Sequence, residues 1–362
     1  MMQNSQPPTP PKAQTRQQTL QQIPQWLQKN LFNTTLNSLL TLLCLAFLVW
    51  VGYGFWSWLA QAQWTVITAN LRLFFVGRYP VNQVWRLWAV LGVFVGMTAL
   101  WTVPQFMQSV QSQRVQSQRV KKRIQLVFYA LLPIAFCAIA YLANGGLGLK
   151  FVRTSLWGGL FLTLLTAAVS ILLAFPFSIL LALGRQSTLP IVRWVCTGYI
   201  ELVRGLPLIG ILFMAQVMLP LLLPDEIRLD RVVRAIAGLM LFNAAYLAEN
   251  VRSGLQAIPK GQTEAAKALG LNTIQTLTLI ILPQSLRIST PAIVGQFISL
   301  FKDTSLLGLF SMFELTGISR TILSQPDFSD RQTEVYLFIG FIYWMVCFSM
   351  SQVSRKLEKQ KA

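Results

Sequence analysis

Residues 264–283 read EAAKALGLNTIQTLTLIILP, and this stretch decides how the rest of the chain is interpreted. Thr263 can cap a first helix, which places Glu264 in its first turn, where a carboxylate complements the helix dipole. Gly270 suits the C-terminal end of this helix, and the Asn-Thr pair after it can begin a second helix that Pro283 closes. On local features alone, the stretch is an ordinary helical hairpin between two apolar segments.

The composition is that of an integral membrane protein. The chain has 362 residues, of which 54% are hydrophobic and 12% are charged, and its mean hydropathy is +0.53. The formal net charge of +18 raises the question of nucleic acid. The basic residues, however, lie in short runs between apolar segments and form no single face with interleaved aromatic side chains. We therefore expect no nucleic-acid partner.

Residue types that support catalysis or metal binding are scarce. The chain has no histidine, and its four cysteines are isolated, without a CxxC pair. The sequence has no GxxxxGK[ST] phosphate-binding loop and no nucleophile–base arrangement. We therefore expect no enzyme, no metal site and no cofactor on this chain, which should not hydrolyse ATP itself.

Apolar segments long enough to cross ~30 Å of hydrocarbon, about 20 residues each, occur eight times. They predict an all-α integral membrane protein with spans at residues 36–59, 87–107, 124–143, 156–183, 194–223, 232–250, from about 288 to beyond 302, and 335–353. This order predicts four parts, which are a flexible cytoplasmic tail (1–30), an extension with three spans (31–148), a core with five spans (149–355) and a C-terminal tail (356–362).

Two of the connectors carry further signals. The direct repeat QSQRV-QSQRV at 111–120 leads into a basic run. This segment is either a contact for anionic lipid headgroups or a polar connector whose charge fixes the topology. Residues 308–330 are expected to form an extracytoplasmic connector with a short helix.

The distribution of lysine and arginine predicts the orientation. With both termini in the cytoplasm, 18 of the 30 basic residues lie in cytoplasmic segments, 10 lie outside and two lie within the membrane. This excess inside favours the orientation and places Glu264 in the cytoplasm.

Charged residues within the apolar spans are costly, at about 2.5–3.5 kcal/mol each, so they usually pair or line a pathway. Glu201 and Arg204 are three residues apart and could pair directly. Lys302 and Asp303 are adjacent and should pair with other helices. Structural ion pairs and a substrate pathway are both open interpretations.

The full spacing of residues 264–283 resembles the EAA loop of ABC-importer permeases, in which the loop is the coupling helix that sits in a groove of a separate ATPase subunit. Each position of that pattern is matched, by Glu264, Ala265, Ala266, Gly270, Ile280, Leu282 and Pro283. Further segments resemble the polar amino-acid branch of this family, namely ELVRGLPL (201–208), YLAE (246–249), AIPKGQ (257–262), LPQ (282–284) and FKDTSL (301–306). The extra N-terminal spans and the connector ANLRLFFVGRYP (69–80) are similar to the M-type permease of general L-amino-acid transporters.

The resemblance implies that the five C-terminal spans have the type I importer fold, with a coupling loop at about 251–287. It implies a complex in the bacterial inner membrane with a second, different permease chain as a heterodimer, two ABC ATPase subunits that bind ATP and Mg, a periplasmic amino-acid-binding protein and membrane lipid. The residues expected to contact the ATPase are Glu264, Ala265, Ala266, Ala268 and Gly270. Those expected along the substrate pathway are Glu201, Arg204, Gly205, Pro207, Lys302, Asp303 and Thr304.

An amino acid is a zwitterion, so a pathway for it must offer both charges. Arg204 or Lys302 could meet the α-carboxylate, and Glu201 or Asp303 the α-ammonium group. A departure from the family pattern, Asn250 and Ser253 in AENVRSG, puts the packing beside the coupling loop in doubt. Alternatives to an ATP-driven importer are an ion-gradient-driven secondary transporter, for which no internal repeat is evident, and a membrane scaffold that only binds an ATPase.

Overall fold

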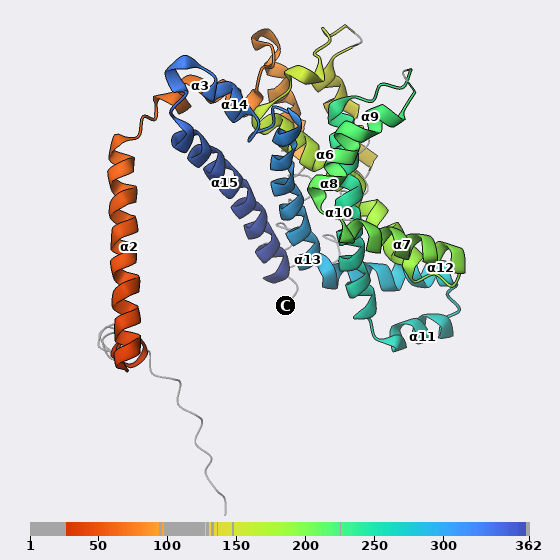
Figure 1. Cartoon of the computed structure of the whole chain (residues 1–362). Helices are drawn as coiled ribbons and strands as arrows, with labels where there is room; N and C mark the ends of the chain where they lie inside the picture. Colours follow the sequence, from red (N-terminus) through yellow and green to blue (C-terminus); the bar gives the residue numbers. More distant parts are fainter. Residues whose placement is uncertain are drawn as a thin grey trace, which may run out of the picture. The chain divides into compact units, whose positions relative to one another are not determined.

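The computed structural model describes residues 27–93, 96–97 and, with gaps at 128–129, 132–133, 136, 147 and 225, residues 127–359. The expected spans at 87–107 and 124–143 lie partly outside these residues, and the repeat at 111–120 and most of the N-terminal tail lie wholly outside. The chain forms two compact units, 1–63 and 64–362, drawn in Figure 1. The division at Trp64 coincides with none of the domain boundaries expected at residues 30, 148 and 355. Those boundaries remain a prediction.

The first unit is built around α2 (Thr35–Gln61), which confirms a helix at the first expected span. Thr34 caps it, since its hydroxyl accepts a 3.2 Å hydrogen bond from the backbone N–H of Asn37. Its mean hydropathy of 2.0, together with a length of about 40 Å for 27 residues, suits a membrane crossing.

The second unit has a bundle of four long helices at its centre. These are α6 (Gly159–Arg185), α10 (Arg231–Gln256), α13 (Leu282–Asp303) and α15 (Gln332–Lys359). α10 packs chiefly on α6 and α13, and α15 packs on α13. In the part of the chain that the structure describes, five helices are apolar and long enough to span a membrane, and a bent helix pair supplies a possible sixth.

Small side chains let α6 and α10 approach closely. Ala174 and Ala182 of α6 and Ala244 and Ala248 of α10 are all buried in one cluster. Helices in lipid associate through such residues, because close backbone approach maximises van der Waals contact. The cluster continues to Ile200 of α7 (Pro190–Gly205) and so fixes the position of α7 on the bundle.

The expected span at 194–223 is not one straight helix. It is a pair of helical segments that meet at an angle of 104°. The first segment is α7 (Pro190–Gly205). The second runs through α8 (Leu208–Phe213), the π-helix η3 (Met214–Met218) and α9 (Leu219–Leu222). Pro207 has no backbone N–H to continue the helix. It also disfavours helical geometry at Leu206, which is extended with φ −99° and ψ 143°. The chain therefore turns sharply at Leu206.

The segment 260–283 forms two helical pieces, although its boundaries differ from those expected. The first, α11 (Lys260–Ala268), begins directly after Pro259. Thr263 is therefore inside the helix and does not cap it, and Glu264 lies in the second turn. Gly270 ends α11 as expected, because its φ of +77° is in the left-handed region. The Leu271 N–H donates to the Ala266 carbonyl at 3.1 Å, which completes a Schellman motif.

Asn272 begins the second piece with a capping box. Its side chain accepts from the backbone N–H of Gln275 at 2.8 Å, and its own N–H donates to the Gln275 side chain at 3.0 Å. Pro283, however, does not close this helix. From α12 (Thr273–Gln275) the chain continues as the π-helix η4 (Thr276–Ile281) into α13, where Pro283 is the second residue. The π-helix directly before Pro283 interrupts the regular α-helical hydrogen-bond pattern where this proline has no N–H to donate.

The opposite end of the bundle is closed by short helices. After α13 come the 3₁₀-helix η5 (Thr304–Phe310) and α14 (Ile318–Leu323), which confirms the short helix expected within 308–330. α3 (Thr65–Val76) packs on α6, α14 and α15 and buries one face that includes Phe74. Figure 1 shows α3 and α14 at the end of the bundle away from α11.

Candidate functional site

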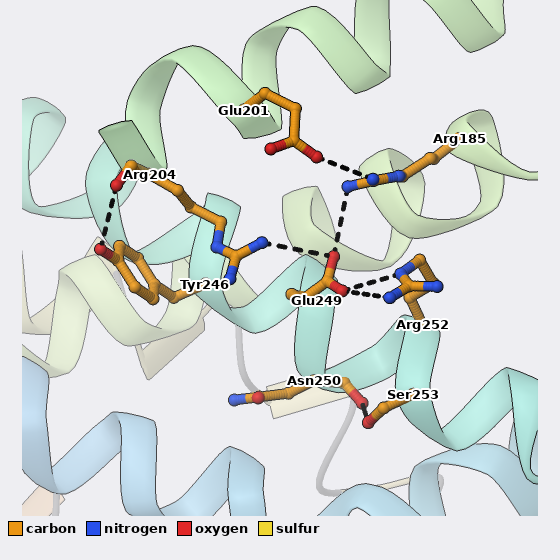
Figure 2. Close-up of polar contacts among 8 residues, drawn as sticks. All are labelled: Arg185, Glu201, Arg204, Tyr246, Glu249, Asn250, Arg252 and Ser253. Carbon is orange, nitrogen blue, oxygen red and sulfur yellow. Dashed lines mark hydrogen bonds and ion pairs between the residues drawn. The ribbon is translucent and has the colours of Figure 1, made fainter. Parts of the chain in front are cut away.

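Five charged side chains from three helices meet in one cluster (Figure 2). Glu249 of α10 lies at its centre, and its carboxylate contacts arginines from three directions. The Arg185 Nη1 lies 3.2 Å from Oε2, the Arg204 Nη1 lies 3.7 Å from the same atom, and the Arg252 Nε donates to Oε1 at 2.9 Å. Glu201 of α7 extends the cluster through a 2.8 Å ion pair with Arg185.

Glu201 and Arg204 do not pair with each other, contrary to the expectation from their spacing. Both lie on α7, but each finds an opposite charge on a neighbouring helix, Glu201 on α6 and Arg204 on α10. Tyr246 adds to the second contact, since the Arg204 guanidinium lies 5.6 Å from the centre of its ring. Sequence reasoning gave Glu249 no role, because its three partners come together only in the folded bundle.

The cluster lies at the end of the bundle where α11 is attached. Arg185 is the last residue of α6, and Glu249 precedes the end of α10 by seven residues. In the same region the Asn250 side chain donates to the Ala292 carbonyl of α13 at 3.3 Å, and the Ser253 hydroxyl donates to the Asn250 carbonyl at 2.8 Å. Of the two residues that depart from the family pattern, Asn250 therefore joins α10 to α13, whereas Ser253 bonds within α10.

A second polar group lies deeper in the bundle. Asn243 of α10 is fully buried and accepts a 2.7 Å hydrogen bond from the Gln296 side-chain amide of α13. The Asp303 carboxyl interacts with the same Asn243 side chain. Asp303 thus contacts another helix, as expected of it. Lys302, in contrast, is exposed and makes no ion pair within the residues that the structure describes.

The residues expected along the substrate pathway therefore belong to two polar groups at different positions along α10. The lower level is the charged cluster around Glu249, and the upper level is the group around Asn243. These two residues are six apart on α10, which corresponds to about 9 Å along its axis. The upper level holds Asp303 and the buried Thr304, whose hydroxyl donates to the Phe301 carbonyl at 2.7 Å. Among the others, Glu201 and Arg204 belong to the lower level, Gly205 is the last residue of α7, and Pro207 precedes α8.

α11 presents most of its expected coupling residues to the outside. Glu264, Ala265, Ala268 and Gly270 are exposed. Ala266 is buried and anchors the helix to its own chain. Leu269, at the tip of the turn, is 81% exposed, an unusual position for a large apolar side chain unless it has a partner. Figure 1 shows α11 beyond the end of α10.

A buried carboxyl group lies at the other end of the bundle. Glu314 follows η5 and is completely inaccessible. Its two oxygens accept backbone N–H bonds from Thr316 at 2.7 Å and Gly317 at 2.6 Å, and the Tyr343 hydroxyl lies 3.3 Å from Oε2. Loss of hydration raises the pKa of Glu314 to about 7, although the two backbone N–H groups act in the opposite direction.

Within the described residues, no group of three or more His, Cys, Asp and Glu side chains could hold a metal ion. The chemistry that this site offers is therefore that of fixed charges and hydrogen bonds at helix contacts. Such groups can bind and release a polar solute, or hold helices in one arrangement.

Comparison with known proteins identifies the family. Residues 174–361 match the family described as "Binding-protein-dependent transport system inner membrane component". The chain is 39% identical to the inner membrane amino-acid ABC transporter permease protein YhdY of Escherichia coli strain K12, over 92% of each chain. It is 33% identical to the glutamate/glutamine/aspartate/asparagine transport system permease protein BztC of Rhodobacter capsulatus, over 92% of this chain and 93% of that one.

A solved structure agrees with this result. A chain from the crystal structure of an amino acid ABC transporter with histidines superposes with a TM-score of 0.51 and 26% identity, covering 56% of this chain and 92% of its own. The likeness confirms the expected type I importer fold and favours it over a secondary transporter. This protein is a multi-pass membrane protein that belongs to the family of amino-acid ABC transporter permeases.

Proposed function

We propose that this chain forms half of an amino-acid pathway through the membrane and that α11 couples it to ATPase subunits on separate chains. The observation that carries the proposal is the exposed face of α11, with Glu264, Ala265 and Ala268 turned outward and Ala266 turned inward. A helix with small exposed side chains lets the backbone of a partner approach closely. ATP and Mg would bind to the partner, because the sequence of this chain contains no phosphate-binding loop.

Movement of α11 would pass directly into the bundle. Residues 257–259 alone separate it from α10, and α11 also packs on η4, which continues into α13. α10 and α13 approach closely at Gly254, where a β-carbon would lie 2.5 Å from the Ser285 carbonyl oxygen. A force on α11 therefore moves α10 and α13 together.

We infer that the charged cluster holds α6 and α7 to this moving pair. Glu249 lies on α10, and its partners lie on all three helices of the cluster. Ion pairs among partly exposed groups can break and form again at modest cost, so they can differ between two states of the bundle. The upper level, with Asp303 and Asn243, is then the candidate for contact with the α-ammonium group of the substrate.

The remaining components follow from this function. A second, homologous permease would complete the pathway, and a periplasmic amino-acid-binding protein would deliver the solute at the end formed by α3 and α14. The C-terminal end of α15 lies at the end of the bundle where α11 lies (Figure 1). α11 and the C-terminal end of α15 are therefore on the same side of the bundle, and our proposal assigns that side, together with the N-terminus, to the cytoplasm.

The first test is purification in mild detergent followed by mass identification of the bound chains. Recovery of an ATPase with a phosphate-binding loop and of a second permease is the expected result. Glu264→Lys should then reduce amino-acid uptake into vesicles at least tenfold, with normal insertion of the chain. Normal uptake by that variant, or uptake that follows an ion gradient and ignores ATP, would overturn the proposal.

A further inference from the structure

A cavity of about 790 Å³ lies at the end of α6 and α10 away from α11. Its walls come from residues 139–144 and 151–157, from α6, from residues 228–236 at the start of α10 and from residues 311–313. It does not include the charged cluster or the Asp303 level, so neither polar group described above explains it.

The lower wall of the cavity is apolar. Leu162, Leu165 and Val169 of α6 line it together with Ile236 of α10, and these residues pack in one hydrophobic cluster. Seven residues of helix separate Leu162 from Val169, a distance of about 10 Å. One leaflet of the ~30 Å hydrocarbon core is about 15 Å deep, so the apolar wall can cover about two thirds of an acyl chain in one leaflet.

The upper wall is strongly basic. It contains Arg153, Arg228, Arg231 and Arg234 but a single acidic side chain, Asp230. The carboxylate of Asp230 is already occupied, because the Thr154 hydroxyl and the Val232 N–H both donate to it.

Arg234 is partly committed as well, since its Nη1 donates to the Gln216 carbonyl at 2.6 Å. Arg153, Arg228 and Arg231 are exposed and make no ion pair among the described residues. The upper wall therefore offers three arginines to an anion from outside the chain.

Two buried polar atoms between these levels lack partners. The indole Nε1 of Trp157 and the side-chain oxygen of Asn144 make no hydrogen bond within the described part of the chain. Both residues line the cavity. A buried donor or acceptor without a partner is costly. Both atoms are inaccessible, however, so they mark a polar part of the wall and are not groups that a ligand in the cavity already reaches.

We propose that this cavity is a binding site for one anionic glycerophospholipid. The phosphate lies against Arg153, Arg228 and Arg231, the glycerol region lies beside Trp157 and Asn144, and an acyl chain lies along α6 and α10. The continuous apolar wall below the arginines favours a lipid over an amino acid or an acidic protein surface, because neither of those has a hydrocarbon chain to place there.

The test uses the complete transport complex in mixed micelles with equal amounts of phosphatidylglycerol and phosphatidylethanolamine. Native mass spectrometry measures the ratio of the two lipids retained. The variant is Arg228→Gln with Arg231→Gln, and the matched control is Arg72→Gln with Arg320→Gln, which removes two exposed charges from α3 and α14 at the same end of the bundle.

We expect the preference for phosphatidylglycerol to fall about 30-fold in the variant and less than about twofold in the control, because each basic residue contributes about fivefold to the binding of an anionic lipid. Val169→Trp, which fills the apolar wall, should reduce retention of both lipids. An unchanged preference in the arginine variant would overturn the proposal. So would full displacement of the lipid by inorganic phosphate, or weaker docking of the soluble binding protein with lipid retention unchanged.

Discussion

Replacement of Glu249 by glutamine tests whether one carboxylate holds the charged cluster together. The substitution keeps the shape of the side chain but removes the negative charge shared by Arg185, Arg204 and Arg252. The net charge of the five-residue cluster rises from +1 to +2, and three guanidinium groups are left close to one another around a neutral amide.

The size of the effect follows from the contacts. Two arginines make charge-assisted bonds to Glu249, with distances of 3.2 Å to Arg185 and 2.9 Å to Arg252, and each such bond contributes about 1.5–3 kcal/mol. Glutamine can still accept one hydrogen bond, and the Glu249 side chain is 22% exposed, so water screens part of the loss. We therefore expect a loss of about 2–4 kcal/mol.

Thermal unfolding of the detergent-solubilised complex provides the assay, and the melting temperature of this 362-residue chain should fall by roughly 3–5 °C. The matched control is Glu201→Gln, because this side chain is 58% exposed and makes one ion pair, at 2.8 Å. The control should cost no more than about 1 kcal/mol. Equal melting temperatures for the two variants would refute the central position of Glu249.

Three further predictions concern other parts of the chain. Leu269→Ser should weaken co-purification of the ATPase at least tenfold without affecting insertion, because burial of a leucine contributes about 1.5–3 kcal/mol; unchanged recovery would contradict a role for Leu269. Gly254→Val should separate α10 from α13 at Ser285 and abolish uptake, whereas Gly340→Val on α15, which has open space around it, should leave uptake near normal. The pKa of Glu314 is raised to about 7, so folding favours its protonated form. The free energy of unfolding should therefore decrease as the pH rises from about 4.5 to 7, by at most about 3 kcal/mol. Melting curves of Glu314→Gln should lack this decrease, and an equal pH dependence in the variant would exclude Glu314 as its source.

The helical segments near the coupling loop were largely predictable, because their signals are local. Gly270 and the Asn272 cap fix their own backbone geometry, and the structure has both. The two prolines were harder to interpret. Pro283 can end one helix or begin the next, and only the continuous π-helix before it shows that the chain remains helical. Pro207 is compatible with a kink or a full turn, and the packing of α7 on α6 and α10 selects the turn.

The ion pairs were not predictable in the same way. Sequence spacing correctly placed Glu201 beside Arg204 on one helix but could not show that other helices offer closer partners. The central role of Glu249 depends on three elements that meet only after folding. Glu314 gave no signal at all, because a carboxyl in a connector is ordinarily exposed.

The most direct test of the coupling role of α11 is site-directed crosslinking between this helix and the ATPase in the intact complex. Ala268→Cys and Ala266→Cys, each in a cysteine-free background, place a thiol on the exposed and the buried side of the same helix. We predict that a short bifunctional reagent links the ATPase to Cys at 268 but not at 266, and that ATP binding changes the yield. No link from 268, or equal links from both positions, would contradict the account.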